Sequence, residues 1–297
     1  MNKSNDISAD DRAQALEFLL HDSEVVTRKS AVVALGRMQG SVARDMLCRA
    51  LDDADEGVRV LACQALARLT DAGCLGAVLS HTHDESPQVK CGILWILANL
   101  IAHGNLSNKE RSSLFEPIAI MAFDPHDAVR ADAAAIIGTL HDARALDALV
   151  VLLEDDCTKV RAQACTSLGL IPSVKAVDLL LSILEDKAEK PLVYVSALDA
   201  LVHQMQTQKL EDETCERALK VIEALISVEV VNAEEETEPS EVTTKDVQAT
   251  AIWALGFVAP LSTCDYDHYK EILQQESDSP DSWKKKYAAE ALTRLGT

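Results

Sequence analysis

The sequence predicts an all-α fold, a solenoid of about eight two-helix repeats. A ten-residue phrase recurs, in which a cation is followed by apolar residues three, six and seven places later. A second amphipathic stretch, with apolar residues at steps of three and four, lies between successive copies. Glycine is scarce, and no stretch alternates between apolar and polar residues as a strand would. Each repeat should therefore hold two helices, and the recurring phrase forms the second.

The cations that open the phrase are regularly spaced, and we call them the ladder residues. They lie 31, 31, 40 and 31 residues apart, so one period recurs three times and the remaining gap is longer by 9. Weaker copies begin at Tyr194, Gln248 and Lys285, which extends the array almost from end to end. Positions in a second helix are counted from its ladder residue. The strong ladder residues are Arg28, Arg59, Lys90, Arg130 and Arg161.

A helical wheel places each ladder residue on the same side as the apolar residues four and seven places later. We therefore expect the ladder cations to lean along the interior and to pair with turn aspartates of their own or the next repeat. The competing interpretation is a stripe of cations that binds anions. Acidic residues just before the second helices, such as Asp55, Asp84 and Asp127, have the chemistry to cap the first N–H groups.

Proline positions agree with these helix boundaries. Seven of the eight prolines fall between predicted helices or at their first residues, where a missing N–H is tolerated. Pro117 alone interrupts a predicted helix. We expect a bent or broken first helix in the fourth repeat.

The turn Asp55-Glu56-Gly57-Val58-Arg59 and the Ala-rich run that follows to Ala67 resemble the HEAT-repeat superfamily. The form is the short repeat named for phycobilisome (PBS) lyase HEAT-like repeats. The resemblance covers nearly the whole chain and implies a right-handed superhelix whose second helices line the concave surface. The chain is then one domain, 1–297, with a short polar N-terminal tail at 1–9.

An acidic insertion separates the sixth and seventh repeats. Residues 211–246 hold 12 acidic and 3 basic side chains, and the gap from Tyr194 to Gln248 is 54 residues, 23 more than the basic period. The sequence predicts a mobile acidic loop at 232–245. Two roles remain open for it, a tolerated insertion or a lure for a basic surface.

The net charge of −20 and the pI near 4.7 repel phosphate backbones and acidic membrane surfaces, so nucleic acid is not an expected partner. The charge fits either a solvated surface or the steering of a basic partner. Met1 to Asp11 lacks the apolar core of a signal peptide, and the longest apolar run, Cys91 to Ala102, is too short to span a bilayer. We expect a cytoplasmic protein, monomeric by default.

No pattern indicates a metal or cofactor. The eight cysteines contain no C-x-x-C, which favours free thiols in a reducing compartment. Four His-Asp dipeptides fall in predicted turns at inconsistent offsets, His83 seven residues before Lys90 but His126 four before Arg130. The deoxyhypusine hydroxylases, which are HEAT-repeat enzymes, hold two irons with His-Glu pairs, and this sequence has no such pair.

Positions two, five and nine of the second helices form an outward face, opposite the buried side. Most are polar, such as Gln64, Thr166 and Asp199, but Trp95 and Trp253 occupy position five and Phe257 occupies position nine. Exposed rings favour binding anchors, and the alternative is that a bent repeat or nearby insertions cover them. The candidate partner-binding residues on the concave face are Trp95, Asn99, Trp253, Phe257, Arg37, Arg68 and His203.

Nothing in the sequence has the form of a nucleophile with its base, a phosphate loop or a pair of catalytic carboxylates. We therefore expect no catalytic residues, no cofactor and a non-enzymatic adaptor or accessory/assembly protein that holds an unknown protein partner in the concave groove. The alternative, which the resemblance implies, is a subunit of a bilin lyase or bilin-handling complex. In that class aromatic residues crowd the first repeats, whereas Ala31 to Gly36 is aliphatic.

Overall fold

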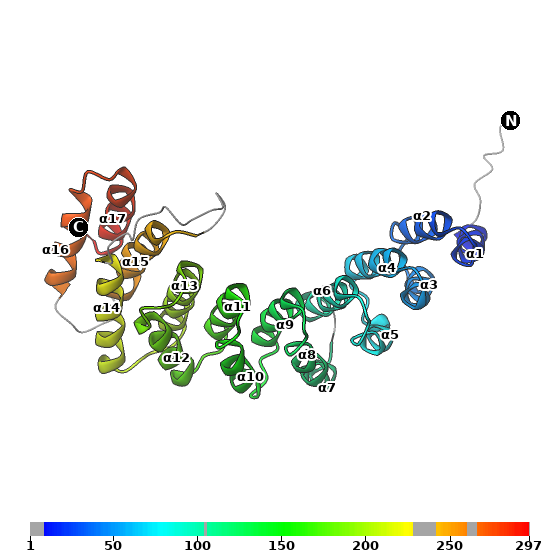
Figure 1. The fold of residues 1–297 in the computed structure, drawn as a ribbon, viewed down its shortest axis with the longest axis horizontal. Helices are drawn as coiled ribbons and strands as arrows, with labels where there is room; N and C mark the ends of the chain where they lie inside the picture. The colour runs from blue at the N-terminus through cyan, green and yellow to red at the C-terminus, as the bar shows by residue number, and fades with distance from the viewer. Residues whose placement is uncertain (1–8, 104–105, 228–241, 260–265, 297) are drawn as a thin grey trace. The chain divides into compact units, whose positions relative to one another are not determined.

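The computed structural model describes residues 9–103, 106–227, 242–259 and 266–296. The described part of the chain folds into helices with no strand, arranged as eight helix pairs, which confirms the all-α solenoid. The chain divides into two compact units, Met1–Ile136 and Ile137–Thr297, each of which is described by itself (Figure 1).

Unit 1 holds three helix pairs and most of a fourth. In Figure 1 the second helices α2, α4 and α6 follow one another in one layer, with the first helices α1, α3 and α5 in the other. The first helices are α1 (Ala9–Leu20), α3 (Ser41–Arg49) extended by the 3-10 turn η1 (Ala50–Asp52), α5 (Leu75–Ser80) preceded by η2 (Ala72–Cys74), and α7 (Asn108–Ser113) with α8 (Phe115–Met121). The second helices are α2 (Val25–Leu35), α4 (Glu56–Leu69), α6 (Pro87–His103) and α9 (Asp127–Thr139).

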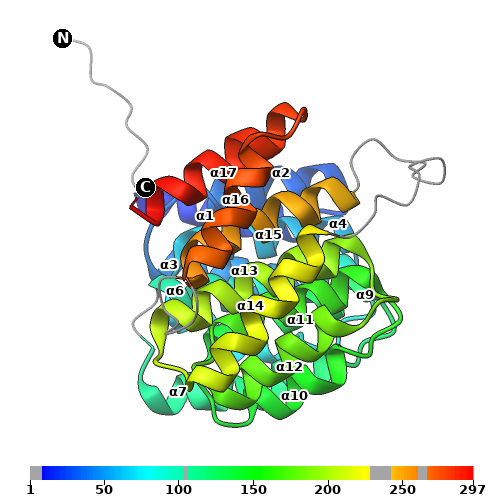
Figure 2. The same cartoon turned by 90° about the vertical axis from the view of Figure 1, so that its left-hand side faces the viewer.

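Unit 2 continues with four more pairs. Its second helices pack in sequence, α11 on α13, α13 on α15 and α15 on α17 (Figure 2). The first helices are α10 (Ala145–Leu152), α12 (Val174–Glu185), α14 (Asp212–Ile226) and α16 (Tyr266–Ser277). The second helices are α11 (Thr158–Gly169), α13 (Pro191–Thr207), α15 (Thr244–Val258) and α17 (Ser282–Arg294).

The core lies between the two helices of each pair and between successive second helices. In α4, positions three, four, six and seven are Ala62, Cys63, Ala65 and Leu66, and each is at most 1% exposed. Small residues at these positions let helix backbones approach closely, since little side-chain volume separates them. The aliphatic content of the repeats is thus spread along a continuous core.

The first helix of the fourth repeat is broken, as the proline predicts. Helix α7 ends at Ser113 and α8 begins at Phe115. Pro117 is the third residue of α8, where a backbone N–H would have no helical partner to lose. Because the helix breaks before Pro117, the proline ring lies in the first turn of α8, where it removes no helical hydrogen bond.

The two segments expected to lack structure fall mainly outside the described residues. This holds for residues 1–8 of the predicted tail and for 228–241, which include most of the predicted acidic loop. The end of that predicted loop is helical, because α15 begins at Thr244. The Thr243 hydroxyl and the Asp246 carboxylate form a capping box that starts the helix.

Candidate partner-binding surface

The ladder residues of unit 1 lie inside and pair with acids of the next repeat. Arg28 Nε and Nη2 donate to both carboxylate oxygens of Asp53 at 2.7 and 2.9 Å. Arg59 forms the same fork with Asp84 at 2.8 and 3.0 Å. The Arg59 and Asp84 side chains are each only 8% exposed. These pairs occupy the arginines in internal contacts, which leaves little guanidinium surface for an anion.

The same acids also organise their own turns. The Asp53 carboxylate accepts from the backbone N–H of Asp55 at 2.8 Å, while its carbonyl oxygen accepts from Arg59 at 3.0 Å. Burial alone would raise the pKa of Asp53, but the hydrogen bonds from Arg28 and from the Asp55 N–H hold it below its usual value. Asp53 therefore joins three elements: the preceding second helix, its own turn and its own second helix.

Later members of the ladder vary this arrangement. Lys90 replaces the fork with a single ammonium contact to Asp124. Arg130 donates to the carbonyl oxygens of Asp124 and Pro125 at 2.9 and 3.2 Å. In unit 2, Arg161 forms a fork with Glu189 at 2.9 and 2.7 Å.

The ladder acids Asp53, Asp84 and Asp124 lie six residues before the next ladder residue, not at the helix caps. Asp55 does cap α4 through the N–H of Val58 at 3.1 Å. Asp84 is a ladder acid whose carboxylate accepts from the Ser86 N–H ahead of α6, so the cap expected there is wrong. Asp127 lies inside the first turn of α9, and its carboxylate accepts from the Ala128 N–H at 2.8 Å, one of the first N–H groups of that helix.

Unit 1 presents its outward face to solvent at positions five and nine. Arg37 and Arg68, both at position nine, are exposed; Arg37 lies just after the end of α2, and Arg68 lies in the last turn of α4. Trp95 is 48% exposed although tryptophan has a large apolar ring. Asn99 lies one turn later on α6 and donates to the Trp95 carbonyl oxygen at 2.9 Å.

Unit 2 brings two of its candidate rings together. Trp253 and Phe257, one turn apart on α15, stack with centroids 4.6 Å apart at 55°. The Arg294 guanidinium of α17 lies 4.2 Å from the Phe257 ring centroid. Both rings are half-buried. Neighbouring helix α17 thus covers part of Phe257, while His203 on α13 is exposed.

Asp199 of α13 lies on this face, and the sequence pattern does not distinguish it from the other polar residues there. Its side chain reaches solvent, yet desolvation by the surrounding protein raises the pKa of its carboxyl. Among the described residues it has no hydrogen bond or ion pair. The sequence feature that could have singled out Asp199 is that position five is an acid in this repeat and a tryptophan, Trp253, in the next.

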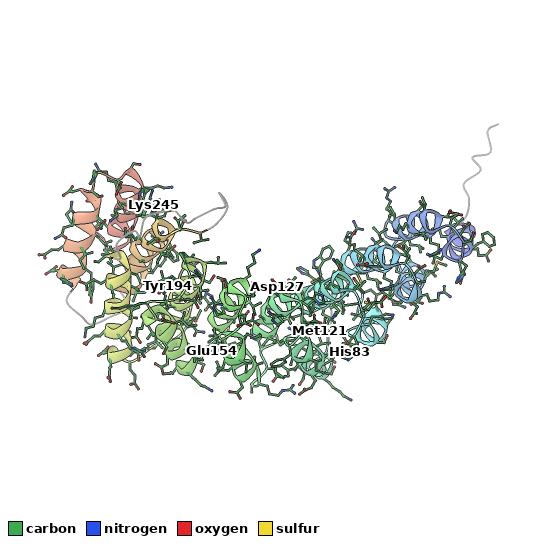
Figure 3. All side chains as sticks on the ribbon, in the orientation of Figure 1. His83, Met121, Asp127, Glu154, Tyr194 and Lys245 are labelled. Carbon is green, nitrogen blue, oxygen red and sulfur yellow. The ribbon has the colours of Figure 1, made fainter. Side chains whose placement is uncertain are left out.

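A cleft of about 1090 Å³ also opens in unit 2, between α12, α13, α14 and the start of α15. Tyr194, labelled in Figure 3, occupies the ladder position of α13 and is in the wall of this cleft. Its hydroxyl donates to the Asp186 carbonyl oxygen. Apolar residues such as Leu184, Val221 and Val247 line the rest, with charged side chains at the rim. The repeat pattern does not predict this cleft, although it shows that position 194 carries no ladder cation.

The described residues hold no cluster of three or more His, Cys, Asp or Glu side chains suited to a metal ion. Burial raises the pKa of the Cys63 and Cys74 thiols to about 12 and that of Cys48 to about 11. These cysteines are therefore inert thiols that fill the core. In the same part of the chain, no helix combines the length and apolar character needed to cross a membrane.

Solved structures with similar folds are solenoids of low sequence identity. YIBA_ECOLI has a TM-score of 0.61 and 18% identity, with 98% of this chain and 93% of that chain covered. Kap121p bound to Nup53p has a TM-score of 0.63 and 15% identity, with 97% of this chain and 33% of that chain covered. An engineered protein has a TM-score of 0.52 and 19% identity, with 96% and 78% covered.

None of the curated proteins compared with the chain matches it. The family model described as HEAT repeats matches residues 12–90 and 116–202, which is more than half of the chain. These stretches include all five strong ladder residues. The chain therefore belongs to the HEAT-repeat family.

Proposed function

We propose that this chain is a non-enzymatic adaptor that binds a protein partner along the outward face of its second helices. The observation that carries the proposal is Trp95, a large ring left 48% exposed on a face of mostly polar side chains. Rigid aromatic rings dominate the energy of many protein interfaces, because they bury a large area with little loss of conformational entropy.

Two structures of similar fold support this class of function. One is Kap121p bound to Nup53p, and another is the same karyopherin bound to the extreme C-terminus of the phosphatase Cdc14p. This chain corresponds to about a third of the length of Kap121p. Their partners are not assigned to it, and a nucleic acid partner is disfavoured by the net charge of −20.

The test is capture of the native partner by variants of the outward face. Trp95→Ala and Trp253→Ala together should keep the melting temperature and lose capture, since each interface ring typically contributes about 2 kcal/mol or more. Phe18→Ala is the matched control, because Phe18 is 76% exposed but lies on the first helix α1. Capture that persists in the double variant, or that fails equally in the control, contradicts the proposal.

The bilin-handling alternative has a direct test of its own. A purified bilin-handling subunit carries a tetrapyrrole that absorbs visible light, whereas the proposed adaptor has no visible band. A stoichiometric band from protein purified from its native cell would replace the adaptor proposal with the bilin one.

A further inference from the structure

The second helices pack with a constant offset that fixes which outward residues face each other. Gly36, at position eight of α2, lies against Ala65, at position six of α4. The same relation joins Gly169 to Ala200 in α11 and α13, and Gly256 to Ala291 in α15 and α17. A residue of one second helix is therefore level with the residue two positions earlier in the next helix.

This offset places Trp253 beside Asp199. Applied to α13 and α15, which pack directly, it puts position five of α15 level with position seven of α13. Trp253, at position five of α15, is therefore level with a point on the outward face of α13 between Asp199 at position five and His203 at position nine. On the other side, Asp199 is level with a point between Thr166 of α11 and Leu170, the residue that follows α11, whose side chain is 38% exposed. By this register, Asp199 is an exposed carboxylate on the levels of Trp253 and Leu170 in the neighbouring repeats.

The carboxylate of Asp199 has no counterion of its own. No cation, N–H or hydroxyl of the described residues contacts it, and desolvation is the cause of the raised pKa of its carboxyl. Most other acids near second helices are engaged, as Asp53 is by Arg28. The Asp199 side chain is exposed and its charge is only partly desolvated, and an incoming cation would pair with a carboxylate that no cation of the described residues neutralises.

The same face already accommodates a cation against a ring. The Arg294 guanidinium lies over Phe257, one turn from Trp253. Long basic side chains pack their aliphatic stems on apolar surface while the charged head pairs elsewhere. An indole ring is the best aromatic partner for such a head.

We infer that Asp199, Trp253 and Leu170 form a pocket for one lysine or arginine side chain of the protein partner. This inference rests on the proposed function and names the chemistry that the partner presents to unit 2. The carboxylate binds the charged head, and the indole ring and the leucine contact its stem. The site selects a basic segment, in keeping with the net charge of −20.

The probes are N-acetyl-arginine methylamide and N-acetyl-lysine methylamide, titrated into the full chain. Trp95→Phe and Trp283→Phe leave Trp253 as the one remaining indole of the three tryptophans, so its N–H resonance reports the site. We expect a saturable shift with both cations. N-acetyl-norleucine methylamide, which has the stem without the charge, should bind at least tenfold more weakly. Equal binding of norleucine would overturn the inference.

Two acid variants separate the site from the general field of the protein. Asp199→Asn should weaken the cations at least tenfold and leave the thermal midpoint of the free protein unchanged, because the exposed carboxylate has no partner among the described residues to lose. Asp156→Asn makes the same change in net charge at an exposed turn and should alter neither the affinity for the cations nor the thermal midpoint. A lower midpoint for Asp199→Asn, or equal weakening by Asp156→Asn, would show that Asp199 has no such role.

The outcome is distinguishable from the failure of the adaptor proposal. If the native partner binds and depends on Trp95, but Asp199→Asn binds it as tightly as the parent, the adaptor stands and the basic pocket falls. If the cation probes bind through Asp199 while capture ignores Trp95 and Trp253, the pocket exists and the adaptor surface is wrong.

Discussion

Gly169 of α11 packs so closely on Ala200 of α13 that a Cβ atom at position 169 would lie 2.9 Å from the Ala200 Cα atom. Contacts of this length do not occur between a real Cβ and backbone, so the two helices would have to separate. Glycine at position 169 is therefore a packing requirement of this pair of helices, where ordinary helix propensity would favour alanine, the residue found at the same position in α4.

Gly169→Ala should destabilise the protein by about 1 kcal/mol, because overpacking costs about 1–3 kcal/mol and exceeds the gain of up to about 1 kcal/mol in helix propensity. Gly76→Ala is the matched control in α5, since nothing lies within 4 Å of its added Cβ. That variant should be as stable as the parent or slightly more so. Urea unfolding followed by circular dichroism measures both, and equal stabilities would contradict the packing argument.

Arg59→Met should reduce the free energy of unfolding by about 3–5 kcal/mol, since it leaves the buried Asp84 carboxylate without its partner. Methionine keeps much of the apolar volume, which isolates the loss of the charge. Lys29→Met removes the ion pair with Asp55, whose side chains are 37% and 32% exposed, and should cost about 0–1 kcal/mol. Chemical denaturation of the two variants provides the comparison. Similar losses of unfolding free energy in both variants would mean that burial does not determine how much a ladder pair stabilises the protein.

The ladder carboxylates predict a loss of stability in acid. The folded-state pKa values of Asp53 and Asp124 are lowered, so their contribution is complete above the unfolded value of about 3.9 and is lost as the pH falls from that value through the lower folded-state value. Unfolding free energies measured between about pH 6 and about pH 2 should fall, and Asp53→Asn should flatten the decline. If Asp53→Asn lost as much stability in acid as the parent, Asp53 would not contribute to the acid sensitivity.

The buried thiols should resist alkylation in the native state. With pKa values of about 12 for Cys63, Cys74 and Cys165, the thiolate fraction at pH 8 is roughly a thousandfold below that of a free cysteine. Mass spectrometry after iodoacetamide treatment should find these three cysteines unmodified in buffer and modified in concentrated urea. Rapid native labelling of Cys63 would show that its helix opens readily.

The repeat number and the broken helix at Pro117 could be predicted because both depend on local periodicity and backbone chemistry. The acid partner of each ladder residue could not. A helical wheel shows the side on which Arg28 lies, but not that its side chain reaches Asp53 in the next repeat, since that distance depends on how the repeats stack.

The candidate surface shows the same division between local and non-local information. The wheel correctly places Trp95 where it reaches solvent. It cannot show that Arg294 from α17 covers part of the Phe257 ring, because that contact joins residues 37 positions apart. The cleft beside Tyr194 likewise depends on the packing of four helices.

The loss of the ladder cation at Tyr194 bears on how the array unfolds. In a linear array, cooperativity comes from nearest-neighbour coupling, and each ladder fork strengthens one such coupling. The step from α13 to α15 has an aromatic hydroxyl bonded within its own repeat, where the steps that start at Arg28, Arg59 and Arg161 have a fork. Helices α14 to α17 therefore form the segment that frays first, with faster amide exchange than α11, and the chain melts in two stages rather than one.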